Sequence, residues 1–252
     1  MAERREWWET FFRGPWLRYQ QSMDAPDLVA PPADFLEAVL DLSPGERVLD
    51  APCGEGRLGR EFARRGYRVT GLDATRSLLA AGRRKARAEG LDVDWVQGDM
   101  RRLPWRRRFD LALCWWGSFG YFSDEENRRH VRAVARALKP GGVFALDLHS
   151  AETLFPSFAR QTWSEREGVA VLSANHYDAE TGRVETEWTL HDGAGGRPRR
   201  ATSSIRVYTL HELRALFLAE GFSECRAFGD LEGAPFELDA RRLILLATKA
   251  LD

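Results

Sequence analysis

The chain has little cysteine and little lysine, and each shortage excludes a kind of site. Its only cysteines are Cys53, Cys114 and Cys225, which lie far apart and form no Cys-x-x-Cys pair, so neither a disulfide framework nor a zinc site is indicated. Only three lysines occur among 37 basic residues, and the formal net charge is −1. The short basic run at 101–108 therefore reflects a general use of arginine, and no nucleic-acid partner is expected.

Long apolar runs are also missing. No uninterrupted apolar segment reaches the length that crosses a bilayer, and the first residues lack the apolar stretch of a secretory signal. We therefore expect a cytoplasmic protein without a membrane partner. The apolar share of 44% is ample for a buried core, and 252 residues allow one large domain or two small ones.

Strand and helix signals alternate between residues 46 and 148. Short apolar runs are separated by helical stretches, of which the third begins with the capping box Ser123-x-x-Glu126. Such alternation is typical of a parallel sheet with crossover helices. The expected helices are 57–65, 75–88 and 124–138.

The pattern changes after His149. Alternating segments separated by turns predict an antiparallel sheet within 160–208, and in one of them Trp188 lies on the apolar, half-buried face. A capping box at Thr209 begins another helix. The expected strands of this second half are 169–177, 184–191, 204–208, 222–228 and 241–248.

Residues 1–42 carry aromatic rings at helical spacing. Most of these rings are expected to pack on the main core. Pro31-Pro32 is expected to break the chain before a helix at 33–41. The rings are those of Trp7, Trp8, Phe11, Phe12, Trp16 and Tyr19.

The most informative segment is 48–59, where an acidic residue ends an apolar run before a glycine pair. Glycines at 54, 56 and 59 let the backbone approach a ligand at the start of a helix. A second strand ends in Asp73, where a carboxylate accepts hydrogen bonds from a ribose diol in such βαβ units. The pattern predicts a nucleotide-type cofactor. Because Asp50 would repel a pyrophosphate, a cationic cofactor without phosphate fits better.

Later motifs continue in the same order. Residues 93–100, 109–116 and 138–147 resemble the third, fourth and fifth strand regions of class I S-adenosylmethionine-dependent methyltransferases. The resemblance covers about 35–150 and extends more loosely to the C-terminus. It implies an α/β, Rossmann-like, seven-stranded, mostly parallel sheet whose last strand is reversed, with an antiparallel β insertion after strand five.

The expected organisation has four parts. An N-terminal helical lid precedes a core that binds S-adenosylmethionine, and an insertion on the substrate side precedes the end of the core. The respective bounds are 1–42, 43–150, 151–208 and 209–252.

The resemblance also implies roles for particular residues. Asp50 would lie near the ammonium of S-adenosylmethionine, Asp73 would accept from both ribose hydroxyls, and Asp99 would accept from the adenine amino group beside the Met100 N–H. Tyr19 of the lid would reach the methionine end. The expected cofactor-binding residues are Tyr19, Asp50, Ala51, Gly54, Gly56, Arg57, Asp73, Ala74, Asp99, Met100, Arg101 and Trp115.

The aromatic loop 115–122 would face the transferred methyl group. It lacks the Asn-Pro-Pro-Tyr tetrad and the Pro-Cys nucleophile of base methyltransferases, which favours a small-molecule acceptor. The ring faces could favour a methylsulfonium or an amine by cation–π attraction, although Trp115 and Phe119 could equally be core residues. The expected substrate-binding residues are Trp116, Phe119, His176, Arg206 and Tyr208.

Methyl transfer by in-line displacement needs a base only when the acceptor arrives protonated. Tyr121 and His149 are the candidates by position. The resemblance thus implies methylation of a small-molecule nitrogen or oxygen, with S-adenosylhomocysteine as the product. Two alternatives stay open: an NAD-linked oxidoreductase, which Asp50 and Asp99-Met100 oppose, and a non-catalytic S-adenosylmethionine-binding protein. The sequence also leaves a homodimer open.

Overall fold

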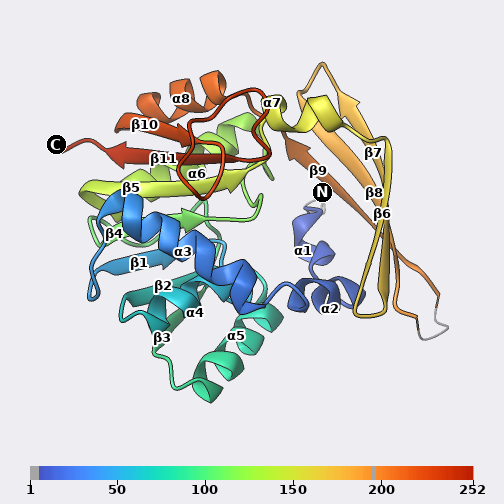
Figure 1. Cartoon of the computed structure of the whole chain (residues 1–252), viewed down its shortest axis with the longest axis horizontal. Helices are drawn as coiled ribbons and strands as arrows, with labels where there is room; N and C mark the ends of the chain where they lie inside the picture. Colours follow the sequence, from blue (N-terminus) through green and yellow to red (C-terminus); the bar gives the residue numbers. More distant parts are fainter. Residues whose placement is uncertain (1–5, 194–196, 252) are drawn as a thin grey trace, which may run out of the picture.

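The computed structural model describes residues 6–193 and 197–251, and its main body is a seven-stranded sheet. The strand order is β10-β11-β5-β4-β1-β2-β3 (Figure 1). All neighbouring pairs among β1 to β5 are parallel, whereas β11 is antiparallel to both β5 and β10. The expected Rossmann-like sheet with a reversed last strand is confirmed. The strands are β1 (Arg47–Asp50), β2 (Arg68–Asp73), β3 (Val93–Gln97), β4 (Phe109–Cys114), β5 (Leu138–Leu148), β10 (Phe222–Phe228) and β11 (Leu243–Lys249).

Helices cover both faces of this sheet, which explains why both faces of its central strands carry apolar side chains. In β4, Leu111 and Leu113 join one buried cluster, while Ala112 and Cys114 join the other. Burial of a ring such as Phe62 or of a leucine contributes about 1.5–3 kcal/mol. The helices that flank the sheet in sequence are α3 (Pro26–Leu40), α4 (Arg57–Arg64), α5 (Arg76–Ala88), α6 (Asp124–Ala137) and α8 (Leu210–Ala219).

The expected capping residues begin two of these helices. Ser123 Oγ accepts from the Glu126 N–H at 3.3 Å before α6. Before α8, Thr209 and Glu212 form a reciprocal capping box, with contacts of 3.1 and 2.8 Å. Each cap satisfies N–H groups that the first helical turn leaves without intrahelical partners.

The predicted break at Pro31-Pro32 is wrong, because α3 continues through both prolines. Pro26 occupies the first turn, where a missing N–H costs nothing. Pro31 and Pro32 leave the carbonyls of residues 27 and 28 without N–H partners, and both of those residues are exposed, so water can hydrate these carbonyls.

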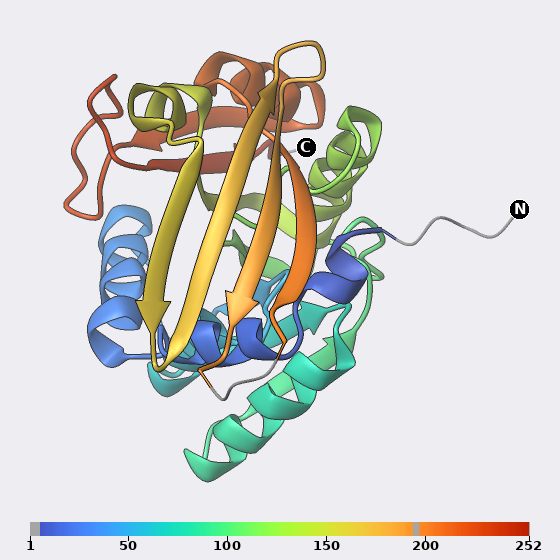
Figure 2. The ribbon, with the colours of Figure 1, turned by 90° about the vertical axis from the view of Figure 1, so that its right-hand side faces the viewer.

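A second, antiparallel sheet follows β5, in the order β6-β7-β8-β9 (Figure 2). A short helix, α7 (Ala151–Leu154), and a 3₁₀ turn (Phe155–Ser157) lead into it. The sequence missed β6, because its side chains are exposed on both faces and give no alternation. The last strand of this sheet was predicted at 204–208, whereas it begins earlier, at Arg199. The strands are β6 (Gln161–Arg166), β7 (Val169–Asp178), β8 (Arg183–His191) and β9 (Arg199–Arg206).

The N-terminal segment, residues 6–24, lies between the two sheets (Figure 1). It contains α1 (Trp8–Phe11) and α2 (Pro15–Gln21). Toward the second sheet, the Arg199 guanidinium donates to the carbonyls of Thr10 and Phe11 at 2.5 and 3.0 Å. Toward the core, Gln21 Nε2 donates to Glu55 Oε1 at 2.9 Å, so hydrogen bonds hold the segment on both sides. Across residues 6–193 and 197–251, no helix is both long and apolar enough to cross a membrane.

Candidate active site

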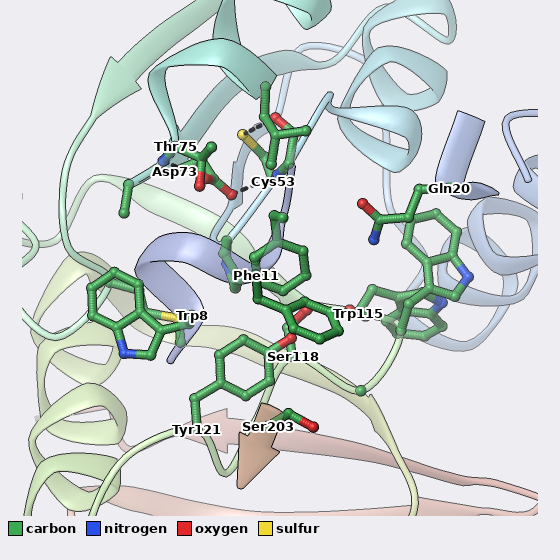
Figure 3. A pocket seen from close by; sticks show the side chains of 18 of the residues that line it. Trp8, Phe11, Gln20, Cys53, Asp73, Thr75, Trp115, Ser118, Tyr121 and Ser203 are labelled. Carbon is green, nitrogen blue, oxygen red and sulfur yellow. Dashed lines mark hydrogen bonds between the residues drawn. The ribbon is translucent and has the colours of Figure 1, made fainter. Parts of the chain in front are cut away.

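A cavity of about 340 Å³ opens beyond the carboxyl ends of the central strands. Successive strands are added on one side of β1 from β1 to β3 and on its other side from β4 onward. Open α/β sheets bind ligands at this point of reversal, between β1 and β4. The core, the N-terminal segment and the second sheet all contribute to the lining. Figure 3 shows Asp73 and Cys53 at one end, Tyr121 and Ser203 at the other, and Phe11 between them.

The glycine turn after β1 has the conformation that its sequence predicts. Gly54 and Gly56 have φ values of 56° and 69°, a region that favours glycine. A Cβ on Gly56 would also lie 2.4 Å from the Trp95 ring, and one on Gly82 of α5 would lie 2.5 Å from it. Gly56 is therefore required both for its backbone angle and for the packing of Trp95, whereas Gly82 is required for the packing alone.

Asp73 closes the turn from the end of β2. Its Oδ2 accepts from the Gly54 N–H at 2.8 Å, and its Oδ1 accepts from the Thr75 N–H at 2.7 Å. Burial raises the pKa of Asp73, and these two backbone hydrogen bonds counteract the shift. The carboxylate keeps acceptor capacity for a ligand hydroxyl, and the residue lines the cavity.

Asp99 lies just beyond β3 and is held by Arg101. The guanidinium donates to both carboxylate oxygens, with its shortest contact at 2.7 Å, and it also pairs with Glu126 at 2.6 Å. Burial alone would raise the pKa of Asp99, but the hydrogen bonds from Arg101 hold it below its usual value. The carboxylate is therefore ionised and fixed in orientation at the cavity wall.

Asp50 lies behind the glycine turn and not in the cavity lining. Its side chain is 4% exposed and accepts from the Gly59 N–H at 3.2 Å. Burial, together with repulsion from Asp73, raises the pKa of Asp50 to about 7, against the effects of the Gly59 hydrogen bond and Arg57. A position near the cofactor ammonium, as the resemblance implies, stays a prediction, and the Asp50 carboxylate would act there from outside the cavity lining.

The loop after β4 brings two tryptophans to the cavity. Trp115 is buried, and within the described part of the chain its indole N–H has no hydrogen-bond partner. Trp116 has a φ of 55°, and the Arg57 guanidinium lies 3.9 Å from its ring centroid. The unpartnered buried N–H suits an acceptor oxygen of a ligand, because a buried donor without one costs free energy.

Both candidate bases line the same cavity. His149 follows β5 and is exposed. Burial raises the pKa of Tyr121 above its usual range, and a hydrogen bond with Ser118 lowers it only in part. Tyr121 therefore stays a neutral phenol near neutral pH, while the His149 side chain is open to water.

The structure brings ten of the expected site residues into one cavity lining. They come from the glycine turn, the ends of the strands and the loop after β4. These residues are Gly54, Arg57, Asp73, Ala74, Asp99, Met100, Trp115, Trp116, Tyr121 and His149.

Other expected cofactor residues lie outside that lining. Tyr19 stacks on Trp16 and its hydroxyl is 3.0 Å from Ser164 Oγ, so it fastens α2 to β6. Ala51 is buried, and Gly56 is covered by Trp95. The remaining two, Asp50 and Arg101, act through the residues that they contact, as described above.

The expected substrate residues Phe119, His176, Arg206 and Tyr208 are not brought to the cavity. Phe119 packs in the core, and the Tyr208 hydroxyl donates to Asp124 at 2.8 Å. Arg206 pairs with Glu212 at 2.7 Å, and His176 is exposed on β7. Residue type alone does not place His176 and Arg206, because the pairing of β7, β8 and β9 decides which of their side chains face inward.

The second sheet instead contributes Trp188, Ser203 and Ile205. Trp188 Nε1 donates to Ser203 Oγ at 2.8 Å. The alternation in β8 had already placed Trp188 on the buried face, so this residue could have been predicted. Ser203 and Ile205 depend on the register of β9, which the sequence did not reveal.

The residues present fit S-adenosylmethionine. Asp73 offers acceptors for a diol, Asp99 offers an acceptor for an amino group, and the buried Trp115 N–H offers a donor. A phosphate fits poorly, because the Asp73 carboxylate already occupies the Gly54 N–H and would repel it.

Comparisons with known proteins agree with this geometry. Residues 48–142 match the model of a methyltransferase domain. A putative methyltransferase of Geobacillus sp. is 32% identical over 42% of this chain and 43% of its own length, so the chain spans less than half of that relative.

Two solved structures resemble nearly the whole chain. An S-adenosylmethionine-dependent methyltransferase from Clostridium acetobutylicum has a TM-score of 0.79 at 18% identity, covering 94% of this chain and all of that one. S-adenosylmethionine-bound CalS10, an amino pentose methyltransferase of Micromonospora echinaspora, has a TM-score of 0.68 at 26% identity, covering 96% and 99% of the two chains. Residues 48–142 of this chain therefore match a methyltransferase domain, and the chain has the fold of S-adenosylmethionine-dependent methyltransferases.

Proposed function

We propose that the chain transfers a methyl group from S-adenosylmethionine to a nitrogen or oxygen of a small-molecule acceptor. One observation carries the proposal: the carboxylates of Asp73 and Asp99 reach the same cavity beside the glycine turn, at the switch point of the sheet. The neighbouring CalS10 is an amino pentose methyltransferase, which supports a small acceptor.

The cofactor supplies a methyl group on a positively charged sulfur, and the residues of the chain supply position. Asp73 would accept from the ribose hydroxyls, and Asp99 with the Met100 N–H would hold the adenine. Aromatic side chains of the N-terminal segment exclude water from the other end of the cavity. Alignment of two reactants in this way supplies about 7–11 kcal/mol of the barrier reduction.

The acceptor must lose a proton if its reacting atom binds in the protonated form, and a methylated amine must lose one if it forms as an ammonium. His149 would take that role, because it lines the cavity and is exposed to water. Tyr121 would act as a neutral hydrogen-bonding group, since burial raises its pKa.

The proposal includes three features that rest on the sequence. They are a cytoplasmic location, the absence of a nucleic-acid partner and the four-part division of the chain. The near-zero net charge supports the second of these. A homodimer is left open.

Thermal unfolding with S-adenosylhomocysteine and with NADH tests the proposal. A ligand at about 100 times its Kd stabilises the folded state by roughly 2.7 kcal/mol. We expect this gain with S-adenosylhomocysteine alone. It should disappear in Asp73→Asn and persist in Asp239→Asn, which changes an exposed carboxylate outside the cavity lining. Stabilisation by NADH alone would support the oxidoreductase instead.

Turnover separates an enzyme from a binding protein. A panel of amines, phenols and carboxylic acids is incubated with the cofactor, and S-adenosylhomocysteine release is measured. Binding of the cofactor without release for any acceptor in the panel would favour the non-catalytic alternative.

A further inference from the structure

Aromatic rings line the cavity on the side away from the core sheet. Three segments provide them: the N-terminal segment, the loop after β4 and strand β8. We call this region the aromatic chamber, and it consists of Trp7, Phe11, Phe12, Trp16, Tyr121 and Trp188.

The rings of the chamber form one continuous set. Trp7 lies 4.8 Å from Tyr121 and 5.5 Å from Phe11, measured between ring centroids. Phe11 in turn lies 4.9 Å from Trp16 and 5.7 Å from Trp188. Edge-to-face contacts of this kind fix the orientation of each ring, so the chamber presents a rigid wall.

Charge is distributed unevenly along the cavity. Among the described lining residues, no Asp, Glu, Lys, Arg or His comes from the N-terminal segment, the second sheet or the loop after β4. The lining residues of these five types all lie elsewhere in the cavity, and they are Glu55, Arg57, Asp73, Asp99 and His149. The Arg57 guanidinium, the one cation among them, donates to the Met23 carbonyl at 2.8 Å and stacks on Trp116.

This distribution discriminates between acceptors by charge. A carboxylate or phenolate in the chamber would lose its hydration without gaining a cationic partner, which is costly. A cation against desolvated ring faces is attracted instead by the negative charge density of the rings. The chamber therefore suits an acceptor that enters uncharged and leaves as a cation.

We propose that the methyl acceptor is an uncharged amine and that Trp188 is the residue that selects it; this inference rests on the proposed function. The amine nitrogen donates its lone pair to form the new N–C bond, the C–S bond of the donor breaks, and its electron pair stays on sulfur. The positive charge thus moves to nitrogen, inside the chamber, and the ammonium later releases its proton to His149 or water.

Trp188 is the ring whose position is best defined on the side of the second sheet. Its N–H donates to Ser203 Oγ at 2.8 Å, and Ser203 is itself 5% exposed. The ring also lies 5.3 Å from Trp16. The hydrogen bond fixes the indole plane, so the π face that meets the acceptor is preorganised.

The test compares probes that share a benzyl group and differ in charge. Benzyltrimethylammonium, its uncharged carbon analogue neopentylbenzene, and phenylacetate are titrated into the full chain with S-adenosylhomocysteine bound. We expect the cation to bind at least about tenfold more tightly than the uncharged analogue and the anion to bind most weakly. Equal or tighter binding of phenylacetate would overturn the inference.

Variants of the same sheet assign the effect to Trp188. Trp188→Ala should weaken binding of the cation by about tenfold, and Trp188→Phe, which keeps a ring, should lose less. Trp163→Ala is the matched control, since that tryptophan is 73% exposed on β6. An unchanged affinity in Trp188→Ala would contradict the role of this residue. If the unaltered chain does not bind S-adenosylhomocysteine, the proposed function itself is contradicted.

Discussion

Replacing Asp50 by asparagine should change the stability of the folded chain in a way that favours the variant increasingly as pH rises. The carboxylate is 4% exposed, and burial is the largest cause that raises its pKa to about 7 from an ordinary 3.8. Between these two values the folded chain keeps a proton that the unfolded chain has lost. Stability therefore falls as pH rises from 3.8, and it levels off above about 7.

The size of the effect follows from the shift in pKa. At about 1.36 kcal/mol per unit, ionisation of Asp50 in the unfolded chain costs about 4 kcal/mol of stability above neutral pH and about 1 kcal/mol near pH 4.5. Asparagine does not titrate and can still accept from the Gly59 N–H. Its new amide N–H groups cost about 1–3 kcal/mol if they find no partner, but that cost is the same at every pH.

Urea unfolding of both proteins at about pH 4.5 and about pH 7.5 measures the difference. The free energy of unfolding of Asp50→Asn, relative to that of the unaltered chain, should increase by about 3 kcal/mol from the lower to the higher pH. A difference that stays constant with pH would show that Asp50 keeps an ordinary pKa, and the argument from burial would be wrong.

Three further substitutions test separate parts of the account. Arg101→Met should weaken S-adenosylhomocysteine binding about tenfold in calorimetric titration, because Asp99 loses the side-chain donors that orient it; an unchanged Kd would show that this pairing has no role. His130→Leu should raise the free energy of unfolding in urea by about 1–3 kcal/mol, because in the described structure both ring nitrogens are buried without a partner. This gain should grow as pH falls below 6.5, since burial lowers the pKa of His130 to about 4 and the unfolded chain takes up the proton first; equal stability of the two proteins would refute the reasoning. Gly82→Ala should lower the melting temperature by an amount worth about 1–3 kcal/mol, because the new Cβ would lie 2.5 Å from Trp95; a rise, as helix propensity alone predicts, would contradict this packing.

Much of the fold could be predicted because its signals are local. Alternating apolar strands and capped helices specify the parallel sheet, and the glycine turn fixes the position of Asp73. The signals failed where a local rule was overridden. Pro31 and Pro32 stay inside a helix because the carbonyls that they free lie next to water, and β6 pairs through its backbone although its side chains show no pattern.

The cofactor end of the site was easier to predict than the acceptor end. Strand ends position Asp73 and Asp99, and a strand end can be read from a short segment of sequence. The acceptor end is assembled from segments far apart in the chain, whose contacts depend on register and on tertiary packing. Tyr19 and Arg206 therefore proved to hold elements together, while Trp188 and Ser203 face the cavity.

A crystal structure of the chain with S-adenosylhomocysteine tests the central claim most directly. We predict that the ribose hydroxyls lie on Asp73, that the adenine lies between Asp99 and Met100, and that the sulfur faces the aromatic chamber. Density for the ligand elsewhere on the molecule, or a ribose remote from Asp73, would contradict the assignment of this cavity as a methyl-transfer site.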